Sequence, residues 1–525
     1  MVLHLGNHLV AGKIILTLLI IITSGFYYVV LYYTYTPRYT HTVPKSYKFK
    51  FAHGSSRFVV LNLVTVNSSL EERKQTKERI DVRQTNLDSS DLTAQTSDTK
   101  CDMHGYVPEN DTVGSPEQLC DMTRFKSWRQ GVVTEMRPVI RRNCEKIATN
   151  DKEEVDRVTH SLKDWKNEES DAQFVLRMSN CSYVREEFSN NFYVSPEERN
   201  FPLAFIFVVY KNARQVVRLL KVIYRPHNLY CIHPDARQGK DFARVFHQIS
   251  KYLDNVFVAS KLEKVYYMHH SILDAQLNCV QDLLKYDQSR WRYAINLVGR
   301  ELPLQTNHYI VKLLKRANNI SIVDSHPIEK SFFNDRFRFK TTVNHISGRV
   351  YSTGQELSAI PHAIKIYKGS THFALTWHFA HFLLTNQKAI DFRQYLNDVW
   401  MPEEEFYASL YHIPEAENHG GYSGNMALPV SYLEMCIWLI KKRTISDFCS
   451  GLKVHSVCIV ATGDLSRVYK FGVSKGRFFF NKYFMEVDHV IMDCIEERLV
   501  QQNKLEYAQD VGCSLSSRNS SFDYK

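Results

Sequence analysis

The chain has 525 residues, of which 44% are hydrophobic and 13% aromatic, so it holds enough apolar side chains for a sizeable core and is neither collagen-like nor disordered throughout. The 66 lysine and arginine residues against 56 aspartate and glutamate residues give a formal charge of +10, and no arginine-rich block concentrates that charge. Nucleic-acid binding therefore has little electrostatic support.

The first element in chain order is an uncharged run over residues 14–33, IILTLLIIITSGFYYVVLYY. A helix rises 1.5 Å per residue, so a run of this length spans a bilayer core of about 30 Å. We therefore predict a single transmembrane helix acting as a signal anchor, after a cytoplasmic tail over residues 1–13; a cleaved signal peptide is the alternative. The lysines and arginines around the run favour a cytoplasmic location for the rest of the chain.

Glycosylation triplets and cysteines indicate an oxidising lumen instead. The triplets begin at five asparagines, Asn67, Asn110, Asn180, Asn319 and Asn519. All eleven cysteines lie beyond residue 100 and form no CxxC or Cys/His zinc pattern, so we expect no zinc site. Their odd number leaves a thiol that is unpaired or bonded to another chain, so a homodimer, disulfide-linked or non-covalent, stays open.

Composition also separates a stem from a compact domain. Residues 67–100 are polar and poor in aromatic side chains, and such a segment cannot bury enough apolar surface to offset its ordering entropy. We predict a stem over residues 34–139, a lumenal domain over residues 140–500 and a C-terminal tail over residues 501–525. Glu153 to Leu176 has a helical pattern.

From Phe201 onward, short apolar runs alternate with helical stretches, which is typical of a mostly parallel α/β sheet. The predicted strands cover residues 203–210, 229–233, 256–259 and 293–298, and the predicted helices cover residues 213–224, 242–253 and about 271–286. Ligands bind beyond the carboxyl ends of the strands in such sheets. Asp235, directly after the second strand, could therefore accept hydrogen bonds from a sugar hydroxyl or a base, although a loop-capping role fits it as well.

Several blocks of this region resemble one known family. They read FPLAFIFVVYKNARQVVRLLKVIYRPHNLYCIHPD, NVFVASKLEKVYY, LNCVQDLLK, YAINLVGRELPLQTN, MPEEEFYASLYHIPE and KVHSVCIVATGDL. Their order and spacing are similar to those of the core-2/I-branching β-1,6-N-acetylglucosaminyltransferases, glycosyltransferase family 14, over about residues 140–500. The resemblance implies a type II, single-pass Golgi membrane protein with a lumenal domain of the GT-A nucleotide-diphospho-sugar transferase type. It overrides the orientation that the flanking charges favour.

The resemblance further implies an inverting transfer of N-acetylglucosamine from UDP-N-acetylglucosamine, in β-1,6 linkage, to core 1-like O-glycans. Such a reaction needs a carboxylate that takes the proton of the attacking hydroxyl and cations that stabilise the departing UDP. None of the 27 aspartates lies two positions from another, so the chain has no Asp-x-Asp motif for a metal. We therefore expect no divalent metal and no cofactor.

The block MPEEEFYASLYHIPE contains three consecutive glutamates. Acidic residues after Pro402 suit the first turn of a helix, so a solvated helix start is the simpler interpretation, while mutual repulsion could raise the pKa of one carboxyl. The family motif superposes its catalytic glutamate on Glu404, with Glu405 in place of the usual tyrosine. The hypothesis is that Glu404 is the general base.

The family holds the donor diphosphate with an arginine and a lysine, and the matching stretches here are CSGLKVHSVCIVATGDL and FFFNKYF. Lys482 matches the lysine, but His455 stands at the arginine position. A histidine is only partly protonated near neutral pH and lacks the guanidinium fork. Lys453 could compensate, because residues two apart in a strand share a face. We expect transfer to weaken as pH rises through the titration of His455; a weak or inactive relative is the alternative.

The same superposition implies further contacts with the sugar nucleotide. Asp235 resembles the uridine contact, Val208 and Val209 resemble the strand end beneath the base, and Tyr267 resembles an aromatic residue on the nucleotide side. Buried core strand residues and a packing tyrosine are the alternatives. Glu301 replaces an aspartate of the family, and the Gly369-Ser370 pair resembles the turn before the helix that lines the acceptor cleft.

The resemblance also implies three disulfides, between Cys144 and Cys494, Cys231 and Cys279, and Cys449 and Cys458. The family's partner for Cys181 is replaced by Tyr252, so Cys181 is free or re-paired among Cys101, Cys120, Cys436 and Cys513.

The acceptor is not predicted. The stretch NNISIVDSHPIEK lacks the acidic residue with which the family reads its acceptor sugars, and only Trp438 lies near the family's aromatic pair. Three functions stay open: the β-1,6-N-acetylglucosaminyltransferase, a peptide O-xylosyltransferase-like enzyme, and a Golgi membrane protein that binds UDP or glycans without catalysis.

Overall fold

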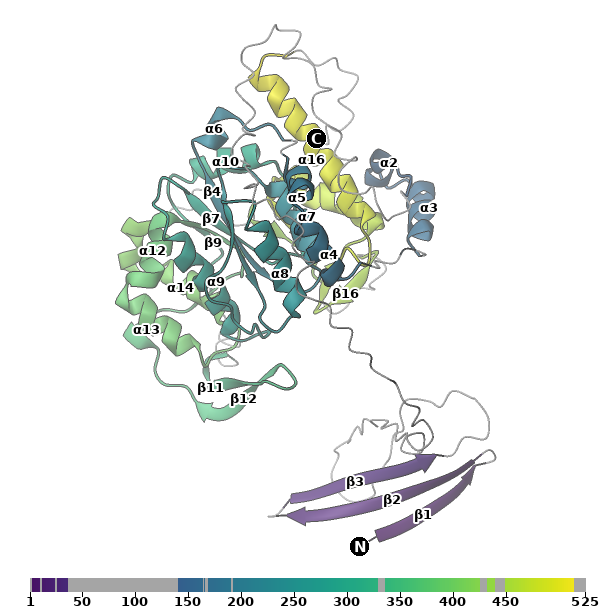
Figure 1. Cartoon of the computed structure of the whole chain (residues 1–525). Helices are drawn as coiled ribbons and strands as arrows, with labels where there is room; N and C mark the ends of the chain where they lie inside the picture. The colour runs from purple at the N-terminus through teal and green to yellow at the C-terminus, as the bar shows by residue number, and fades with distance from the viewer. Residues whose placement is uncertain are drawn as a thin grey trace, which may run out of the picture. The chain divides into compact units, whose positions relative to one another are not determined.

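The computed structural model describes residues 2–9, 12–23, 26–35, 140–163, 165, 169–189, 192–328, 336–424, 432–439 and 449–513. The chain divides into two compact units, Met1–Thr96 and Ser97–Lys525, and both are drawn in Figure 1. The predicted stem, apart from its first two residues, lies outside the described residues.

The first unit contains an antiparallel sheet of three strands, β1 (Val2–Leu9), β2 (Gly12–Thr23) and β3 (Phe26–Tyr35). The helix predicted over residues 14–33 is therefore wrong for this structure. Isoleucine, valine, threonine, tyrosine and phenylalanine make up much of this stretch and favour strands, and strand pairing satisfies the backbone N–H and C=O groups. Among the described residues, no helix combines the length and the apolar character needed to cross a membrane.

The second unit is built on a six-stranded sheet in the order β6-β5-β4-β7-β14-β9 (Figure 1). Strands β6, β5, β4 and β7 are parallel to one another, whereas β14 runs antiparallel to both β7 and β9. The prediction of a mixed, mostly parallel sheet is confirmed. The strands are β4 (Leu203–Val209), β5 (Leu229–Pro234), β6 (Val256–Val258), β7 (Tyr293–Leu297), β9 (Ile322–Val323) and β14 (Phe373–Thr376).

Helices flank both faces of the sheet, and a hydrophobic core lies on each face. Successive residues of a strand point to opposite faces, so alternate residues belong to different cores. Phe205 and Phe207 of β4 belong to one core, whereas Ala204 and Ile206 belong to the other. The first core includes residues of α7 (Ala213–Ile223), α8 (Lys240–Ile249), α10 (Asn307–Arg316) and α16 (Val490–Asp510). The second includes residues of α9 (Ser271–Leu283), α12 (Trp377–Thr385), α13 (Gln387–Leu396) and α14 (Pro402–Leu410).

Further helices and short 3-10 turns complete the second unit. They are α2 (Cys144–Ala148), α3 (Lys152–Leu162), α4 (Asp171–Met178), α5 (Cys181–Phe188), α6 (Pro196–Arg199) and α15 (Leu465–Phe471), with 3-10 turns at Pro361–Ala363, Pro414–His419, Thr462–Asp464 and Val473–Lys475. The helical pattern predicted over 153–176 is split between α3 and α4. The side chain of Ser170 caps the start of α4 in a capping box with Gln173, so a new helix begins after Ser170.

Short sheets surround the main one. A three-stranded sheet has the order β15-β18-β8, and three pairs of strands join β10 with β13, β11 with β12 and β16 with β17. These strands are β8 (Glu301–Pro303), β10 (His326–Pro327), β11 (Phe339–Asn344), β12 (Arg349–Glu356), β13 (Tyr367–Lys368), β15 (Glu434–Met435), β16 (Leu452–Val454), β17 (Val457–Ile459) and β18 (Phe479–Asn481).

Disulfide bonds cross-link the second unit. The structure contains disulfides between Cys144 and Cys494, Cys231 and Cys279, and Cys449 and Cys458, the pairs that the sequence resemblance implies. Cys181 and Cys513 are also disulfide-bonded, whereas Cys436 is a free thiol. Cys101 and Cys120 lie outside the described residues.

Two predicted glycosylation sites lie in the described part of the chain. Asn180 and Asn319 are both exposed, so both are accessible for modification. Asn67, Asn110 and Asn519 lie outside the described residues. Helix α16 continues to Asp510, so ordered structure passes the predicted boundary at residue 500.

Candidate active site

The carboxyl end of β5 leads directly to Asp235. Its backbone N–H donates to the carbonyl of Val209 at 2.9 Å, and its carboxylate accepts the N–H of Val265 at 3.1 Å. The guanidinium of Arg237 pairs with the same carboxylate at 2.7 Å. The buried Asp235 therefore caps a loop, as the alternative interpretation held, and it does so where ligands bind in parallel sheets.

The two valines at the end of β4 differ in exposure. Val209 is 1% exposed and belongs to the core, whereas Val208 is half-buried. Gly299 packs against this strand end with φ +75°, and a Cβ atom there would lie 2.8 Å from Cγ1 of Val209. Only glycine combines that backbone conformation with such a close approach.

The loop after Val265 carries Tyr267 to the start of α14. The backbone N–H of Met401, the residue before α14, donates to the carbonyl of Met268 at 3.2 Å. Burial and the negative charges of Glu404 and Glu403 raise the pKa of the Tyr267 phenol. Tyr267 nevertheless remains 55% exposed, which leaves its ring accessible to a ligand.

His455 lies against the same tyrosine, with ring centroids 4.8 Å apart. It occupies the turn between β16 and β17, where His455 and Ser456 have φ values of 49° and 64°. The prediction that Lys453 and His455 share a face of one strand is therefore wrong. A two-residue hairpin turn of type I′ has positive φ at both positions, and this conformation interrupts the alternation of a strand. Lys453 remains in β16 and is exposed.

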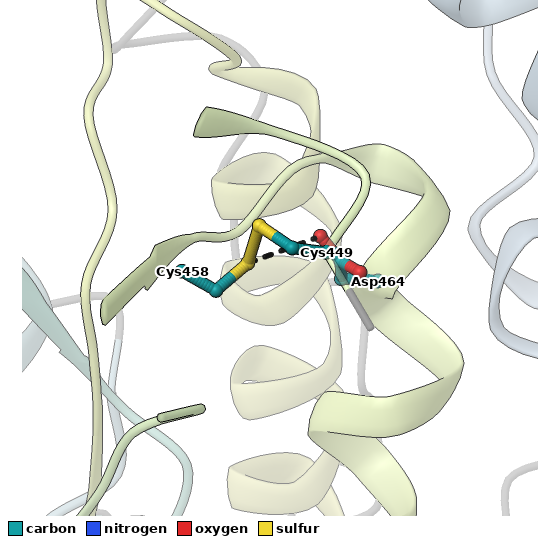
Figure 2. Close-up of side chains that lie close together, drawn as sticks. All are labelled: Cys449, Cys458 and Asp464. Atoms are coloured by element: carbon teal, nitrogen blue, oxygen red, sulfur yellow. Dashed lines mark hydrogen bonds between the residues drawn. A yellow bond between two sulfur atoms is a disulfide. The ribbon is translucent and has the colours of Figure 1, made fainter. Parts of the chain in front are cut away.

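A disulfide and a carboxylate secure this hairpin, as Figure 2 shows. One ligand atom from each of Cys449, Cys458 and Asp464 lies within 4.8 Å of the others. The two sulfurs are bonded to each other, and Asp464 accepts the backbone N–H of Ser450 at 2.9 Å and of Ala461 at 3.0 Å. Because metal binding by cysteine requires a free thiolate, the cluster is structural.

The three consecutive glutamates occupy the first turn of α14 and have different surroundings. Glu403 and Glu405 are buried, so the prediction of a solvated helix start is wrong for both. Burial raises the pKa of Glu403 to about 8 and that of Glu405 well above its usual range. The Glu404 side chain is 23% exposed, so it is the one of the three that an incoming hydroxyl can reach.

Two cations hold the Glu404 carboxylate. Arg336 donates from Nη2 at 2.7 Å, and the ammonium of Lys368 lies at 3.1 Å. Arg336 also donates from Nη1 to the buried carboxylate of Glu405. One guanidinium therefore joins the two neighbouring carboxylates and fixes the orientation of Glu404 through a charge-assisted hydrogen bond.

The segment from Gly369 to His372 links this glutamate to a second charged group. Gly369 donates its N–H to the carbonyl of Glu404 at 2.7 Å. A Cβ atom on Gly369 would lie 2.0 Å from the carbonyl oxygen of Asp324, so this close backbone approach requires glycine. His372 lies between Glu301 and Glu434, with 3.6 Å from Nε2 to the first carboxylate and 3.6 Å from Nδ1 to the second.

Lys482 interacts electrostatically with the same two carboxylates. Burial lowers the pKa of the Lys482 ammonium, and the charges of Glu301 and Glu434 oppose that effect. The three residue steps between Gly369 and His372 span at most about 11 Å of extended chain. The backbone beside Glu404 and the histidine beside Lys482 are therefore close enough for one ligand to contact both ends. An anionic group of a ligand would pair with the Lys482 ammonium, which burial has partly removed from water.

Sequence reasoning missed four charged residues of this arrangement: Arg336, Lys368, His372 and Glu434. Lys368 and His372 flank the Gly369-Ser370 turn, so a search for charged residues beside that turn would have found them. No local signal points to Arg336 or Glu434, because they reach the site from other segments of the chain.

A surface hollow of about 300 Å³ lies elsewhere, next to α13, and Lys340, Tyr395 and Asp398 are among its lining residues. None of the residues predicted to bind the sugar nucleotide lines it.

Comparisons with known proteins agree with the resemblance. The family model "Branch: Core-2/I-Branching enzyme" matches residues 203–429. The chain is 34% identical over 346 residues, 64% of this chain and 78% of the relative, to "Beta-1,3-galactosyl-O-glycosyl-glycoprotein beta-1,6-N-acetylglucosaminyltransferase 4" of Danio rerio.

Two further relatives have related names. A "Beta-1,3-galactosyl-O-glycosyl-glycoprotein beta-1,6-N-acetylglucosaminyltransferase" of Bos taurus is 30% identical over 397 residues, 72% of this chain and 89% of the relative. An "N-acetyllactosaminide beta-1,6-N-acetylglucosaminyl-transferase" of Mus musculus is 32% identical over 314 residues, 58% of this chain and 74% of the relative.

Proposed function

Because the chain belongs to the Core-2/I-branching enzyme family, we propose that it is an inverting β-1,6-N-acetylglucosaminyltransferase of the GT-A type, with UDP-N-acetylglucosamine as donor and a core 1-like O-glycan as acceptor. One observation carries the mechanism: the Gly369–His372 segment contacts Glu404 at one end and the carboxylates beside Lys482 at the other. Glu404 as the base and Lys482 as the cation for the leaving group can therefore act on the same bound donor.

Glu404 takes the proton in this mechanism. The acceptor hydroxyl oxygen attacks the anomeric carbon from the face opposite UDP, so the new carbon–oxygen bond forms as the bond to the diphosphate oxygen breaks. The carboxylate of Glu404 accepts the hydroxyl proton, and the electron pair of the broken bond leaves with UDP. Arg336 and Lys368 hold the carboxylate in place.

Cationic and aromatic residues bind the donor. Lys482 stabilises the negative charge that develops on the diphosphate, with His455 and Lys453 contributing from the β16–β17 hairpin. Tyr267 packs against the nucleotide beside His455, and this fits its exposed ring. Asp235 accepts hydrogen bonds from the uridine beside Val208 and Val209; the donor then competes with Arg237 for this carboxylate.

We propose that the reaction requires no divalent metal. In the part of the chain that the structure describes, the one group of three close candidate ligands is Cys449, Cys458 and Asp464. Its sulfurs are oxidised to a disulfide, and the nitrogen cations around Glu404 and Lys482 supply positive charge without an ion.

The Golgi lumen is the proposed location of the second unit. Disulfides form and persist in oxidising compartments, and this unit contains three between described cysteines. The exposed Asn180 and Asn319 are suited to glycosylation in the same compartment.

Incubation of the purified full-length chain with UDP-sugars and two acceptors, core 1 glycopeptide and N-acetyllactosamine, tests the proposal in the presence and absence of EDTA. We expect transfer of N-acetylglucosamine to core 1, a β-1,6 linkage by NMR, and an unchanged rate in EDTA. Xylose transfer to a peptide, or UDP binding without any transfer, would contradict it. Preference for N-acetyllactosamine would correct the acceptor alone, and non-reducing electrophoresis of the preparation tests for a homodimer.

A further inference from the structure

A histidine lies between two carboxylates beside the proposed diphosphate site. His372 precedes β14, Glu301 begins β8 and Glu434 begins β15, so three elements meet at this imidazole. The side chains of His372, Glu301 and Glu434 are 8%, 0% and 13% exposed, so solvent screens their charges little. Nε2 of His372 and Oε1 of Glu434 have no hydrogen-bond partner in the described part of the chain.

The hydroxyl oxygen of Ser370 lies 3.4 Å from Nδ1 of His372, and the next contacts of the imidazole are charge interactions. Both ring nitrogens lie 3.6 Å from a carboxylate oxygen, which is too long for a good hydrogen bond. Burial alone would lower the pKa of His372, but the charges of Glu434 and Glu301 outweigh burial and raise it. His372 therefore carries a proton over a wider pH range than an ordinary histidine, and Lys482 is the cation that opposes this charge.

This cluster lies next to the cation that has to bind an anion. Lys482 directly follows β18, whose Asn481 pairs in register with Glu301. Burial raises the pKa of Glu434, and the charge of His372 opposes that effect. Once both glutamates are ionised, a neutral His372 leaves two negative charges beside a bound diphosphate, whereas an imidazolium reduces the net charge to one. Charges this close and this poorly screened change binding strongly.

We propose that His372 is a positioning residue whose imidazolium offsets one of the two negative charges of the Glu301–Glu434 pair and so keeps Lys482 available to the diphosphate of the sugar nucleotide. This inference rests on the proposed function, which assigns the diphosphate to Lys482. The titratable groups that face His372 are Glu301, Glu434 and Lys482, while the charges of Arg300 and Cys436 also act on Lys482.

Calorimetric titration of the full-length chain with UDP tests the inference at about pH 6 and about pH 8.5, where a histidine changes its charge. We expect His372→Gln to weaken UDP binding about tenfold at the lower pH, and the difference from wild type to narrow as rising pH removes the proton of the wild-type imidazole. In transfer assays the variant raises KM for the donor and changes kcat little.

A double variant separates charge from structure. His372→Gln combined with Glu434→Gln restores the net charge of the cluster, so we expect UDP affinity within about threefold of the wild type. His308→Gln is the matched control, because His308 is also buried beside a carboxylate, that of Glu198 at 3.8 Å, in a different cluster. This control leaves UDP binding unchanged.

The outcomes separate this inference from the proposed function. Wild-type chain that binds UDP with the same affinity as His372→Gln overturns the inference alone, and so does a double variant that binds as weakly as the single one. Wild-type chain that binds no UDP at either pH overturns the proposed function as well.

Discussion

The imidazole ring of His455 packs against the phenol ring of Tyr267, with their centroids 4.8 Å apart. His455 comes from the turn of the β16–β17 hairpin, and Tyr267 comes from the loop whose Met268 carbonyl accepts the N–H of Met401. The contact brings two residues assigned to the donor nucleotide to the start of the helix that carries Glu404. The packing of these two rings therefore places the proposed donor-binding residues beside the helix that carries the proposed base.

Replacement of Glu404 by glutamine removes the proposed base. We expect kcat to fall by about 10²-fold or more, since an amide cannot accept the proton of the attacking hydroxyl. UDP affinity stays near the wild-type value because the donor contacts lie elsewhere. Steady-state transfer assays measure this, with the exposed Glu417→Gln as control. Transfer within about threefold of wild type would show that another group is the base.

Replacement of Arg336 by methionine leaves Glu405 buried without its cation. The Arg336 side chain is 12% exposed and that of Glu405 is 0% exposed, and breaking such a buried pair costs about 3–5 kcal/mol. Urea unfolding measures the loss. Arg244→Met is the control, because the exposed pair of Arg244 with Asp241 contributes about 0–1 kcal/mol. Equal effects of the two variants would refute a structural role for Arg336.

Replacement of His455 by arginine restores the residue that the family carries at this position. A guanidinium stays charged at every relevant pH and offers a fork for phosphate oxygens. We therefore expect KM for the sugar nucleotide to fall about threefold. Steady-state measurement of KM for the variant and the wild type decides. An unchanged KM would mean that the residue at this position does not contribute to donor binding.

Glu403 makes stability depend on pH. Its pKa is raised from 4.5 to about 8 by burial, so its contribution is fully present below about pH 4.5 and is lost as pH rises through about 8. Glu403→Gln is neutral at every pH, so we expect its free energy of unfolding to fall less steeply over this window, by about 1 kcal/mol per pH unit. Urea unfolding at several pH values measures the slope. Parallel curves for variant and wild type would contradict a buried, protonated Glu403.

The disulfide between Cys144 and Cys494 joins residues 350 positions apart. Replacing both cysteines by serine releases the flank before the sheet from α16, and we expect a loss of about 2–5 kcal/mol. The Cys449–Cys458 bridge spans only 9 positions, so its removal frees less chain entropy and costs less. Thermal unfolding of both double variants under non-reducing conditions compares them. A larger loss for the short bridge would rule out the entropic explanation.

The local pattern of apolar residues was sufficient to predict the central strands. The predicted strand over residues 203–210 is β4 at Leu203–Val209, and the predicted strand over 293–298 is β7 at Tyr293–Leu297. A run of apolar residues between turn signals has few other ways to bury its side chains. The same reasoning failed for residues 14–33, because an apolar run of β-branched and aromatic residues is compatible with either a helix or paired strands.

The local sequence pattern determined the central strands and helices between residues 203 and 298, and the family resemblance implied the motif around Glu404 and the three cysteine pairs. Only the tertiary structure decided that Arg336 joins Glu404 to Glu405, that His372 lies between Glu301 and Glu434, and that His455 occupies a turn. These contacts join segments that are distant in the chain. Their geometry follows from how the sheets and helices pack, and no local preference encodes it.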